Sequence, residues 1–281
     1  MNREKLVHCA EIYKIRDRKI NILDTATIRK PKKKETLLFI PGAGGSIWNW
    51  KYQLKYFFDK GYRVVAYDPV GHGGSEIVDK YDFENHYQDL LQIIKKLNIR
   101  QMVLVSHSSA TQIALFYIKD SHSELKKLVL VSVSLYDNDG PVWQTFISLP
   151  RIFGTCIYSI FKPFRGSVAR LLFFSKTTPY ENIKNFIKEN GVPHYKTLQI
   201  FRSYANFDAS SWAKYFRKPT LIISGKEDKL IPVKVNQKVN RTIPNSKFYM
   251  LENAGHCCFY EKPALFNRIM NQFLKEQKNN K

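Results

Sequence analysis

Short apolar runs alternate along the chain with segments of helical spacing, and this alternation constrains the fold more than any other feature of the sequence. "TLLFI" at residues 36–40, "RVVAYD" at 63–68 and "MVLVS" at 102–106 are too short for helices, and an amphipathic segment follows each of them. Strands that alternate with helices in this way predict parallel βαβ units. We therefore expect an α/β fold with a doubly wound, mostly parallel sheet.

The alternation stops between residues 139 and 215. This stretch is rich in aromatic residues, contains no convincing strand, and is divided by prolines into short segments of helical spacing. The rhythm of strand and helix then resumes at residue 216. We predict a core domain in two parts, residues 1–138 and 216–281, with residues 139–215 inserted as a helical cap, or lid.

The net charge of the chain is +21, because 45 Lys and Arg residues stand against 24 Asp and Glu residues. Such a charge suits an anionic partner, but it also fits a lysine-rich composition whose lysines lie on solvated faces. The densest basic run, "RKPKKK" at residues 29–34, carries no nucleic-acid-binding signature. We favour solvated lysines, expect no nucleic-acid partner, and keep weak association with an anionic membrane surface as a minor alternative.

The four cysteines, Cys9, Cys156, Cys257 and Cys258, form neither a disulfide framework nor a metal-binding spacing, which fits a reducing compartment. The N-terminal residues are charged and lack the apolar core of a secretory signal. No uncharged apolar run approaches the roughly 18 residues of a membrane span. We expect a soluble, cytoplasmic protein without a metal site, either a monomer or a homodimer.

A serine-rich corner, Ser106-His107-Ser108-Ser109-Ala110, joins one apolar strand to the next amphipathic segment. A nucleophile on a sharp strand-to-helix turn needs small residues two positions away on either side. Around Ser108 these positions hold Ser106 and Ala110, which are both small. Around Ser109 one of them holds the bulkier His107. Ser108 therefore fits such a turn, although a serine that only caps the following helix would be the simpler interpretation.

Two further groups that acyl transfer requires come later in the chain. Asp228 follows the apolar run that ends at Gly225, and His256 follows the next apolar run. Residues beyond the carboxyl ends of parallel strands meet in one crevice. We therefore expect Asp228 and His256 to converge on Ser108.

Together these features resemble the α/β-hydrolase fold superfamily, in particular its serine-nucleophile, lipase- and esterase-like members with a helical cap. The resemblance covers nearly the whole chain and depends on "FIPGAGGSIWNW", "VVAYDPVGHGGS", the serine corner, "GKEDKLIP" and "NAGHCCFYEKP". It implies that Ser108 is the nucleophile, that His256 is the general base and then the general acid, and that Asp228 orients the imidazole. It implies no cofactor.

The same resemblance places the oxyanion hole at the backbone N–H groups of Ala43 and Ser109. Gly42 and Gly44 lie in the same loop as Ala43. With Trp48, they are expected to line the substrate pocket. Two features depart from the usual pattern of the family. The serine corner has no glycine, and a proline stands where the family commonly has a histidine before the first glycine of the loop.

Other polar residues compete for roles in the site. Asp137 and Asp139 lie where some relatives place the acid, and we favour Asp228 over them. His72, in "DPVGHGGS", is expected to organise its own loop, and His107 is expected to pack away from the site.

A serine nucleophile favours esters, thioesters and amides, and the apolar insertion favours a hydrophobic acyl group. We predict a serine hydrolase that cleaves carboxylic esters or thioesters of small hydrophobic molecules or lipids through an acyl-enzyme. Three alternatives remain open. They are an acyltransferase with the same triad, a C–C bond hydrolase that uses Arg165, Arg170 or Arg202, and a non-catalytic binding protein of the same fold.

Overall fold

The computed structural model describes residues 1–281 except 79–80, 121, 137–164, 191–202, 204–206 and 277–281. Its strands are β1 (Glu11–Ile15), β2 (Arg18–Asp24), β3 (Thr36–Ile40), β4 (Arg63–Tyr67), β5 (Met102–His107), β6 (Leu125–Val131), β7 (Thr220–Gly225) and β8 (Ser246–Leu251). Its helices are α1 (Arg3–Val7), α2 (Lys51–Asp59), α3 (Phe83–Lys96), α4 (Ala110–Tyr117), α7 (Arg165–Phe173), α8 (Tyr180–Glu189), α10 (Ser210–Ala213), α11 (Val233–Thr242), α12 (Cys258–Glu261) and α13 (Pro263–Lys275), with 3-10 turns η1 (Thr25–Thr27) and η2 (Ile47–Trp50). None of the described helices is long and apolar enough to cross a membrane.

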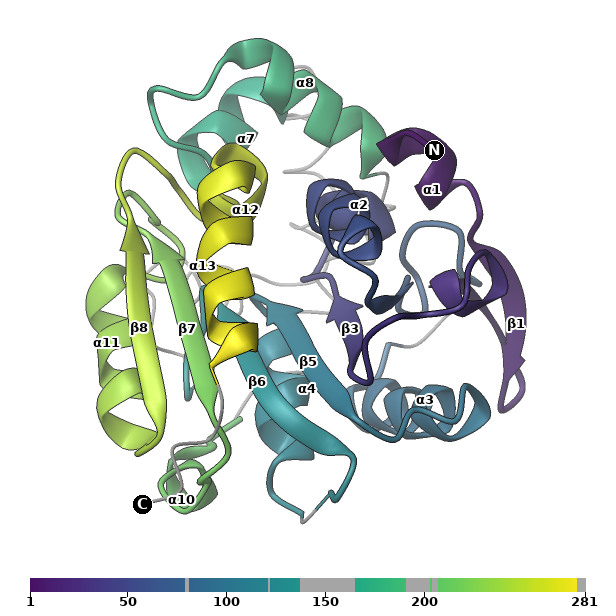
Figure 1. The fold of residues 1–281 in the computed structure, drawn as a ribbon. Helices are drawn as coiled ribbons and strands as arrows, with labels where there is room; N and C mark the ends of the chain where they lie inside the picture. The colour runs from purple at the N-terminus through teal and green to yellow at the C-terminus, as the bar shows by residue number, and fades with distance from the viewer. Residues whose placement is uncertain (79–80, 121, 137–164, 191–202, 204–206, 277–281) are drawn as a thin grey trace.

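The strands form one 8-stranded sheet in the order β1-β2-β4-β3-β5-β6-β7-β8 (Figure 1). Strands β3 to β8 are parallel, whereas β1 and β2 form an antiparallel hairpin at one edge. The predicted α/β fold with a mostly parallel sheet is confirmed. The chain places β4 on one side of β3 and β5 on the other, so the carboxyl ends of β3 and β5 form a topological switch point, where such sheets bind ligands.

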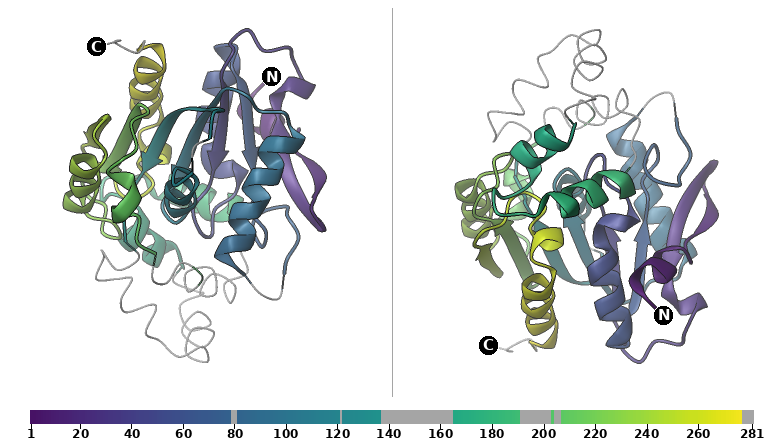
Figure 2. Two further views of the ribbon diagram at one scale, coloured as in Figure 1. Left: turned by 90° about the horizontal axis from the view of Figure 1, so that it is seen from below. Right: turned by 90° about the horizontal axis from the view of Figure 1, so that it is seen from above.

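Helices cover both faces of the sheet, with α2 and α13 on one face and α3, α4 and α11 on the other (Figure 1 and Figure 2). Successive side chains of β5 therefore enter different halves of the core. Met102 and Leu104 pack on the side of α3 and α4, and Val103 and Val105 pack on the side of α2 and α13. Burial on both faces is the reason why the parallel strands are continuous apolar runs in the sequence.

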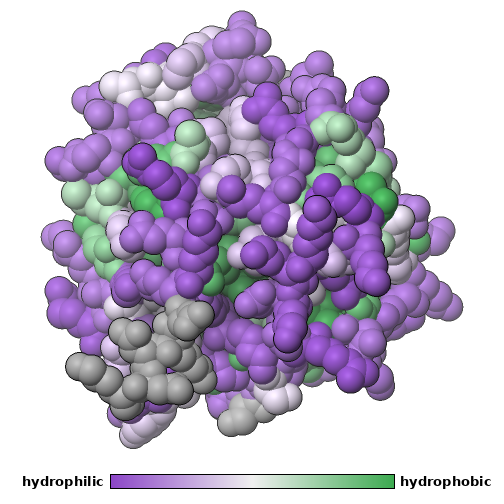
Figure 3. Space-filling model, in the orientation of Figure 1, coloured by the Kyte–Doolittle hydropathy of each residue, from purple (hydrophilic) through white to green (hydrophobic). Residues whose placement is uncertain are grey.

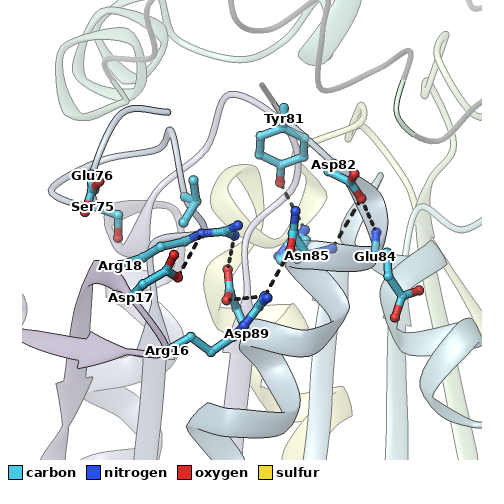
Figure 4. Close-up of polar contacts among 12 residues, drawn as sticks. Arg16, Asp17, Arg18, Ser75, Glu76, Tyr81, Asp82, Glu84, Asn85 and Asp89 are labelled. Carbon is cyan, nitrogen blue, oxygen red and sulfur yellow. Dashed lines mark hydrogen bonds and ion pairs between the residues drawn. The ribbon is translucent and has the colours of Figure 1, made fainter. Parts of the chain in front are cut away.

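The edge hairpin is fastened to α3 by charged side chains (Figure 4). Asp89 of α3 accepts hydrogen bonds from Arg18 at 3.1 Å and from Arg16 at 3.4 Å. Arg16 lies in the tight turn of the hairpin with a φ of 55°. Burial raises the pKa of Asp89, while both arginines act to lower it. The outermost strands are thus held to the core by ion pairs as well as by sheet pairing.

Helices α7 and α8 lie beyond the carboxyl ends of the parallel strands, at the top of Figure 1, and the view from above in Figure 2 shows them across these ends. Residues 207–215, predicted to end the insertion, contact the core on the side of α4. Trp212 Nε1 donates a hydrogen bond to the carbonyl oxygen of Leu115 on α4 at 2.7 Å. Much of the remaining insertion lies outside the described residues, so the boundaries 139–215 stay a prediction.

Candidate active site

Ser108 occupies the sharp turn between β5 and α4. Its φ is 53°, in the left-handed region that residues other than glycine rarely adopt. The Ser108 N–H donates to the carbonyl of Val131 at 2.9 Å, and the Thr111 hydroxyl donates to the Ser108 carbonyl at 2.6 Å. Ser106 and Ala110 are both fully buried on either side of the turn. The small flanking residues thus stand where the tight backbone leaves little room.

Asp228 and His256 form a buried, hydrogen-bonded pair. His256 Nδ1 lies 2.9 Å from Asp228 Oδ2. The other carboxylate oxygen accepts the backbone N–H groups of Leu230 and Ile231, each at 2.9 Å. The side chains of Asp228 and His256 are 0% and 3% exposed. Because Nδ1 faces the carboxylate, Nε2 is the ring nitrogen that remains for proton transfer.

The backbone of His256 is held against the serine turn. Its carbonyl oxygen lies 3.1 Å from His107 Nε2 and 3.3 Å from the Ser132 hydroxyl, and the rings of His107 and His256 are 4.7 Å apart. The expectation that His107 packs away from the site is therefore wrong. The side chain of His107 lies on the face of the sheet that holds Trp50 and Phe259, which is also the face reached by the His256 loop.

Burial lowers the pKa of His107 well below its ordinary value, so the ring is neutral and can donate from Nε2 to the carbonyl of His256. In the part of the chain that the structure describes, the Ser108 hydroxyl makes no hydrogen bond to the imidazole of His256. Catalytic hydrogen bonds are often long or misaligned without substrate and tighten when it binds.

The glycine loop that follows β3 approaches the serine turn closely. A Cβ atom on Gly42 would lie 2.9 Å from Ser108 Cβ, so this position admits glycine alone without movement. Gly44 has a φ of 82°, and the space beside it is open. Trp48 is half-buried on η2, and its ring packs edge to face against His8 at 5.0 Å. The structure therefore places Gly42 directly beside Ser108 and the Trp48 ring beside the N-terminal helix.

The two predicted oxyanion-hole residues are bonded to each other. The Ala43 N–H donates to the Ser109 hydroxyl at 2.7 Å, and Ser109 is 8% exposed. This contact places the Ala43 N–H next to the residue whose own N–H is the second predicted donor. It also gives the Ala43 N–H an acceptor before any substrate arrives. The sequence could not show this contact, because the contact depends on the rotamer of the Ser109 side chain.

The segment that contains Asp68 and His72 has a structural role in its own loop, as predicted for His72. The Asp68 carboxylate accepts the backbone N–H groups of Ile47 at 2.7 Å and Gly74 at 2.8 Å, and the side-chain amide of Asn21 at 2.8 Å. Burial raises the pKa of Asp68 and lowers that of His72 to about 4. His72 is therefore a neutral structural residue near pH 7.

Two carboxylates anchor the cap helices to the core. On the side of His256, Glu261 accepts the N–H groups of Gly255 at 2.7 Å and Ser175 at 2.8 Å, and it also accepts the Thr178 hydroxyl. Burial raises the pKa of Glu261, while these hydrogen bonds lower it. The residues that join α7 to α8 are thereby tied to the loop of the candidate general base.

On the side of the glycine loop, Glu189 of α8 pairs with Lys51 and accepts the hydroxyl of Tyr260 at 3.1 Å. The next residue, Asn190, accepts the Ser46 N–H at 3.0 Å. Sequence reasoning missed both anchors, because the partners lie far apart in the chain.

The residues considered as alternatives in the sequence lie outside the described part of the chain or have other partners. Asp137, Asp139 and Arg202 lie outside the described residues, and so does the side chain of Arg165. Arg170 donates to the carbonyl of Lys176 at 3.0 Å, within the cap itself. Within the described residues, no group of three or more His, Cys, Asp or Glu side chains could hold a metal ion.

The mostly parallel sheet, the serine on a left-handed turn at its switch point and the buried Asp–His pair beside that turn define a protein of the α/β-hydrolase class. The model of the alpha/beta hydrolase fold family matches residues 35–263. The chain belongs to this family.

Protein ABHD8 of Homo sapiens is similar to the chain, with 25% identity over 248 residues that cover 85% of this chain and 54% of that protein. The chain thus spans about half the length of this relative. Two solved structures share the fold. A bromoperoxidase from Bacillus anthracis has a TM-score of 0.81 at 22% identity and covers 95% of this chain and 100% of its own. An esterase from Exiguobacterium antarcticum has a TM-score of 0.78 at 20% identity, with coverages of 94% and 99%.

Proposed function

We propose that this chain is a serine hydrolase that cleaves carboxylic esters or thioesters with hydrophobic acyl groups through an acyl-enzyme. The observation that carries the proposal is the buried pair of Asp228 and His256, 2.9 Å apart, at the end of the sheet where Ser108 occupies a left-handed turn. A hydroxyl, a base and an acid that orients the base are the groups that acyl transfer needs.

In the first step the Ser108 hydroxyl oxygen attacks the carbonyl carbon of the ester, and its proton passes to His256 Nε2. Asp228 stabilises the imidazolium that forms, because its carboxylate accepts the Nδ1–H. The negative charge that develops on the substrate oxygen is bound by the N–H groups of Ser109 and Ala43. The leaving alcohol or thiol then takes the proton from Nε2, and the acyl group stays on Ser108.

In the second step a water molecule gives a proton to His256 and attacks the acyl-enzyme, which releases the acid and restores the Ser108 hydroxyl. An apolar surrounding for the acyl group is supported by Phe173 of α7, whose ring lies 5.9 Å from the His256 ring. The structural neighbour from Exiguobacterium antarcticum is named as an esterase, which supports the same class of reaction.

The test is covalent labelling with a fluorophosphonate probe, followed by intact-mass measurement and peptide mapping. We expect one label on Ser108 in the wild type and in Ser109→Ala, and none in Ser108→Ala. A series of p-nitrophenyl esters of increasing chain length then measures the acyl preference, and kcat/KM is expected to rise from acetate to longer chains. Absence of label on folded wild type would reject the hydrolase in favour of a binding protein with this fold.

A further inference from the structure

We propose that the end of the sheet at which the parallel strands begin, opposite the candidate active site, is a docking surface for an anionic lipid membrane. The proposal does not depend on the proposed reaction. This surface, called here the basic edge, is formed by exposed basic residues near the N-terminal ends of the parallel strands. They are Lys32, Lys33, Lys34, Arg100, Lys126 and Arg217.

The register of the strands sets these charges in a row. The first residue of β3 pairs with the first residue of β5, and that residue pairs with the first residue of β6. Lys34 and Arg100 each lie two residues before their strand, and Lys126 is the second residue of β6. Because neighbouring strands lie about 4.8 Å apart, these three positions fall within roughly 10 Å along the edge.

The lysine run before β3 has a fixed backbone. The N–H groups of Lys32 and Lys33 both donate to the carbonyl of Gly61, at 2.8 and 3.0 Å. Lys32, Lys33 and Lys34 are all exposed, so their ammonium groups extend from a held loop. A preference of helix carboxyl ends for cations explains Lys95 and Lys96 at the end of α3, but the run before β3 follows the short 3-10 turn η1 and no α-helix.

The hydrogen-bond partners of the basic residues at this edge do not neutralise their positive charge. Lys126 donates to the carbonyl oxygen of Ser123 at 2.9 Å, and Arg100 donates to the side-chain oxygen of Asn98 at 3.0 Å. These acceptors are neutral. Three carboxylates have their own partners, with Asp59 paired to Lys55, Glu124 bonded to Tyr117 and Glu276 paired to Lys247. Glu35 follows Lys34 directly, so residues 32–35, with three lysines and one glutamate, keep a net charge of +2.

Exposed apolar side chains among these charges favour lipid over nucleic acid. Tyr215 is 68% exposed, lies between Lys214 and Arg217 in the chain, and has its ring 5.1 Å from the Lys214 ammonium. Ile28 is 36% exposed beside Arg29. Lysines attract an anionic leaflet, and an aromatic side chain suits the level of the headgroups.

The basic edge and the candidate site lie at opposite ends of the molecule. Helix α10, which ends just before Lys214, lies at the bottom of Figure 1, and α7 and α8 lie at the top. The side view in Figure 3 shows mostly hydrophilic residues with small, separate apolar patches. Docking through the basic edge would therefore leave the candidate site facing the water, open to substrates that arrive in solution.

The test is co-sedimentation of the full chain with vesicles of phosphatidylcholine alone or with added phosphatidylserine, at low salt. The edge variant is Lys32→Gln/Lys33→Gln/Lys34→Gln. The control is Lys176→Gln/Lys184→Gln/Lys188→Gln, which removes the same charge from exposed positions on the cap side. Each basic residue near an anionic surface contributes about a fivefold factor in binding. We expect the edge variant to lose about 100-fold in partition coefficient and the control to lose about threefold or less.

A second measurement reports the orientation. Quenching by brominated lipids is compared for Tyr215→Trp and for Tyr180→Trp, which replaces a residue 45% exposed on α8. Stronger quenching at position 215 supports docking through the basic edge. Equal losses in the two lysine variants, stronger quenching at position 180, or tighter binding to duplex DNA than to anionic vesicles at the same salt concentration would each overturn the proposal.

Discussion

Removal of the Ser109 hydroxyl is expected to accelerate acylation. In the structure this hydroxyl accepts the Ala43 N–H at 2.7 Å, and the proposed oxyanion requires the same N–H. The hydrogen bond from the Ala43 N–H to the Ser109 hydroxyl must break before this N–H can donate to the oxyanion. A net hydrogen bond is worth about 0.5–1.5 kcal/mol. This free energy corresponds to a factor of about 2 to 10 in rate. Ser109→Ala removes the competing acceptor, so the acylation rate should rise about 2- to 10-fold.

The measurement is the pre-steady-state burst of p-nitrophenol from p-nitrophenyl butyrate, which reports acylation separately from hydrolysis of the acyl-enzyme. Ser109→Thr is the matched control, because it keeps a hydroxyl on the same carbon and should retain a rate close to that of the wild type. Ser108→Ala gives the background. Urea unfolding of each variant shows whether the substitution has changed the fold.

A decrease of about 10²-fold or more in a folded Ser109→Ala variant would refute this reasoning, because the loss of an oxyanion donor costs about 10²–10³-fold. Such a result would mean that the hydroxyl turns toward the substrate and donates to the oxyanion as a third group. The sign of the effect therefore separates a competing acceptor from a catalytic donor.

Three other predictions follow from the same site. Asp228→Asn should lower kcat by about 10⁴-fold with unchanged circular dichroism, because the amide can no longer stabilise the imidazolium. Gly42→Ala would place a methyl group 2.9 Å from Ser108 Cβ, so it should abolish most activity and cost about 1–3 kcal/mol in urea unfolding. Burial lowers the pKa of His72 from 6.5 to about 4, so its contribution to stability is complete above pH 6.5 and is lost as the pH falls toward 4. His72→Gln should therefore reduce the pH slope of the unfolding free energy in this window by about 1.4 kcal/mol per pH unit.

Each of these predictions has a result that would contradict it, and Gly42→Ala also has a matched variant. Gly44→Ala meets no atom within 4 Å but keeps a φ of 82°, so it should cost about 1–2 kcal/mol of stability and retain more activity than Gly42→Ala. Equal activity in the two glycine variants would contradict the close approach to Ser108. A loss of less than tenfold in Asp228→Asn would point to another acid for His256. An unchanged pH slope in His72→Gln would mean that the imidazole is protonated in the folded state.

The sequence predicts the sheet and the serine turn well, because both depend on local patterns. Buried parallel strands leave continuous apolar runs, and a tight turn leaves small residues at Ser106 and Ala110. Asp228 and His256 could be placed together because parallel strands bring their carboxyl ends to one edge. Chain order and strand direction carry this part of the site.

The sequence does not predict contacts that depend on a rotamer or on two distant segments. The hydrogen bond between the Ala43 N–H and the Ser109 hydroxyl is one such contact, since the sequence around Ser109 does not determine which rotamer its side chain adopts. The contact between His107 and the His256 carbonyl is another, because it requires knowing which face of the sheet the C-terminal loop crosses. The pairing of Glu189 with Lys51 joins residues 138 positions apart in the chain.

The attachment of the His256 loop has a consequence for heat inactivation. The loop is bonded to the ends of two central strands through His107 and Ser132, to α12 through Glu261, and to α7 through the Phe173 carbonyl, which accepts the Cys257 N–H at 3.1 Å. A segment tied at so many points to the central sheet opens only when the sheet itself opens. On heating, activity should therefore disappear at the temperature where the whole domain melts, with no earlier phase in which the domain is folded but His256 is displaced.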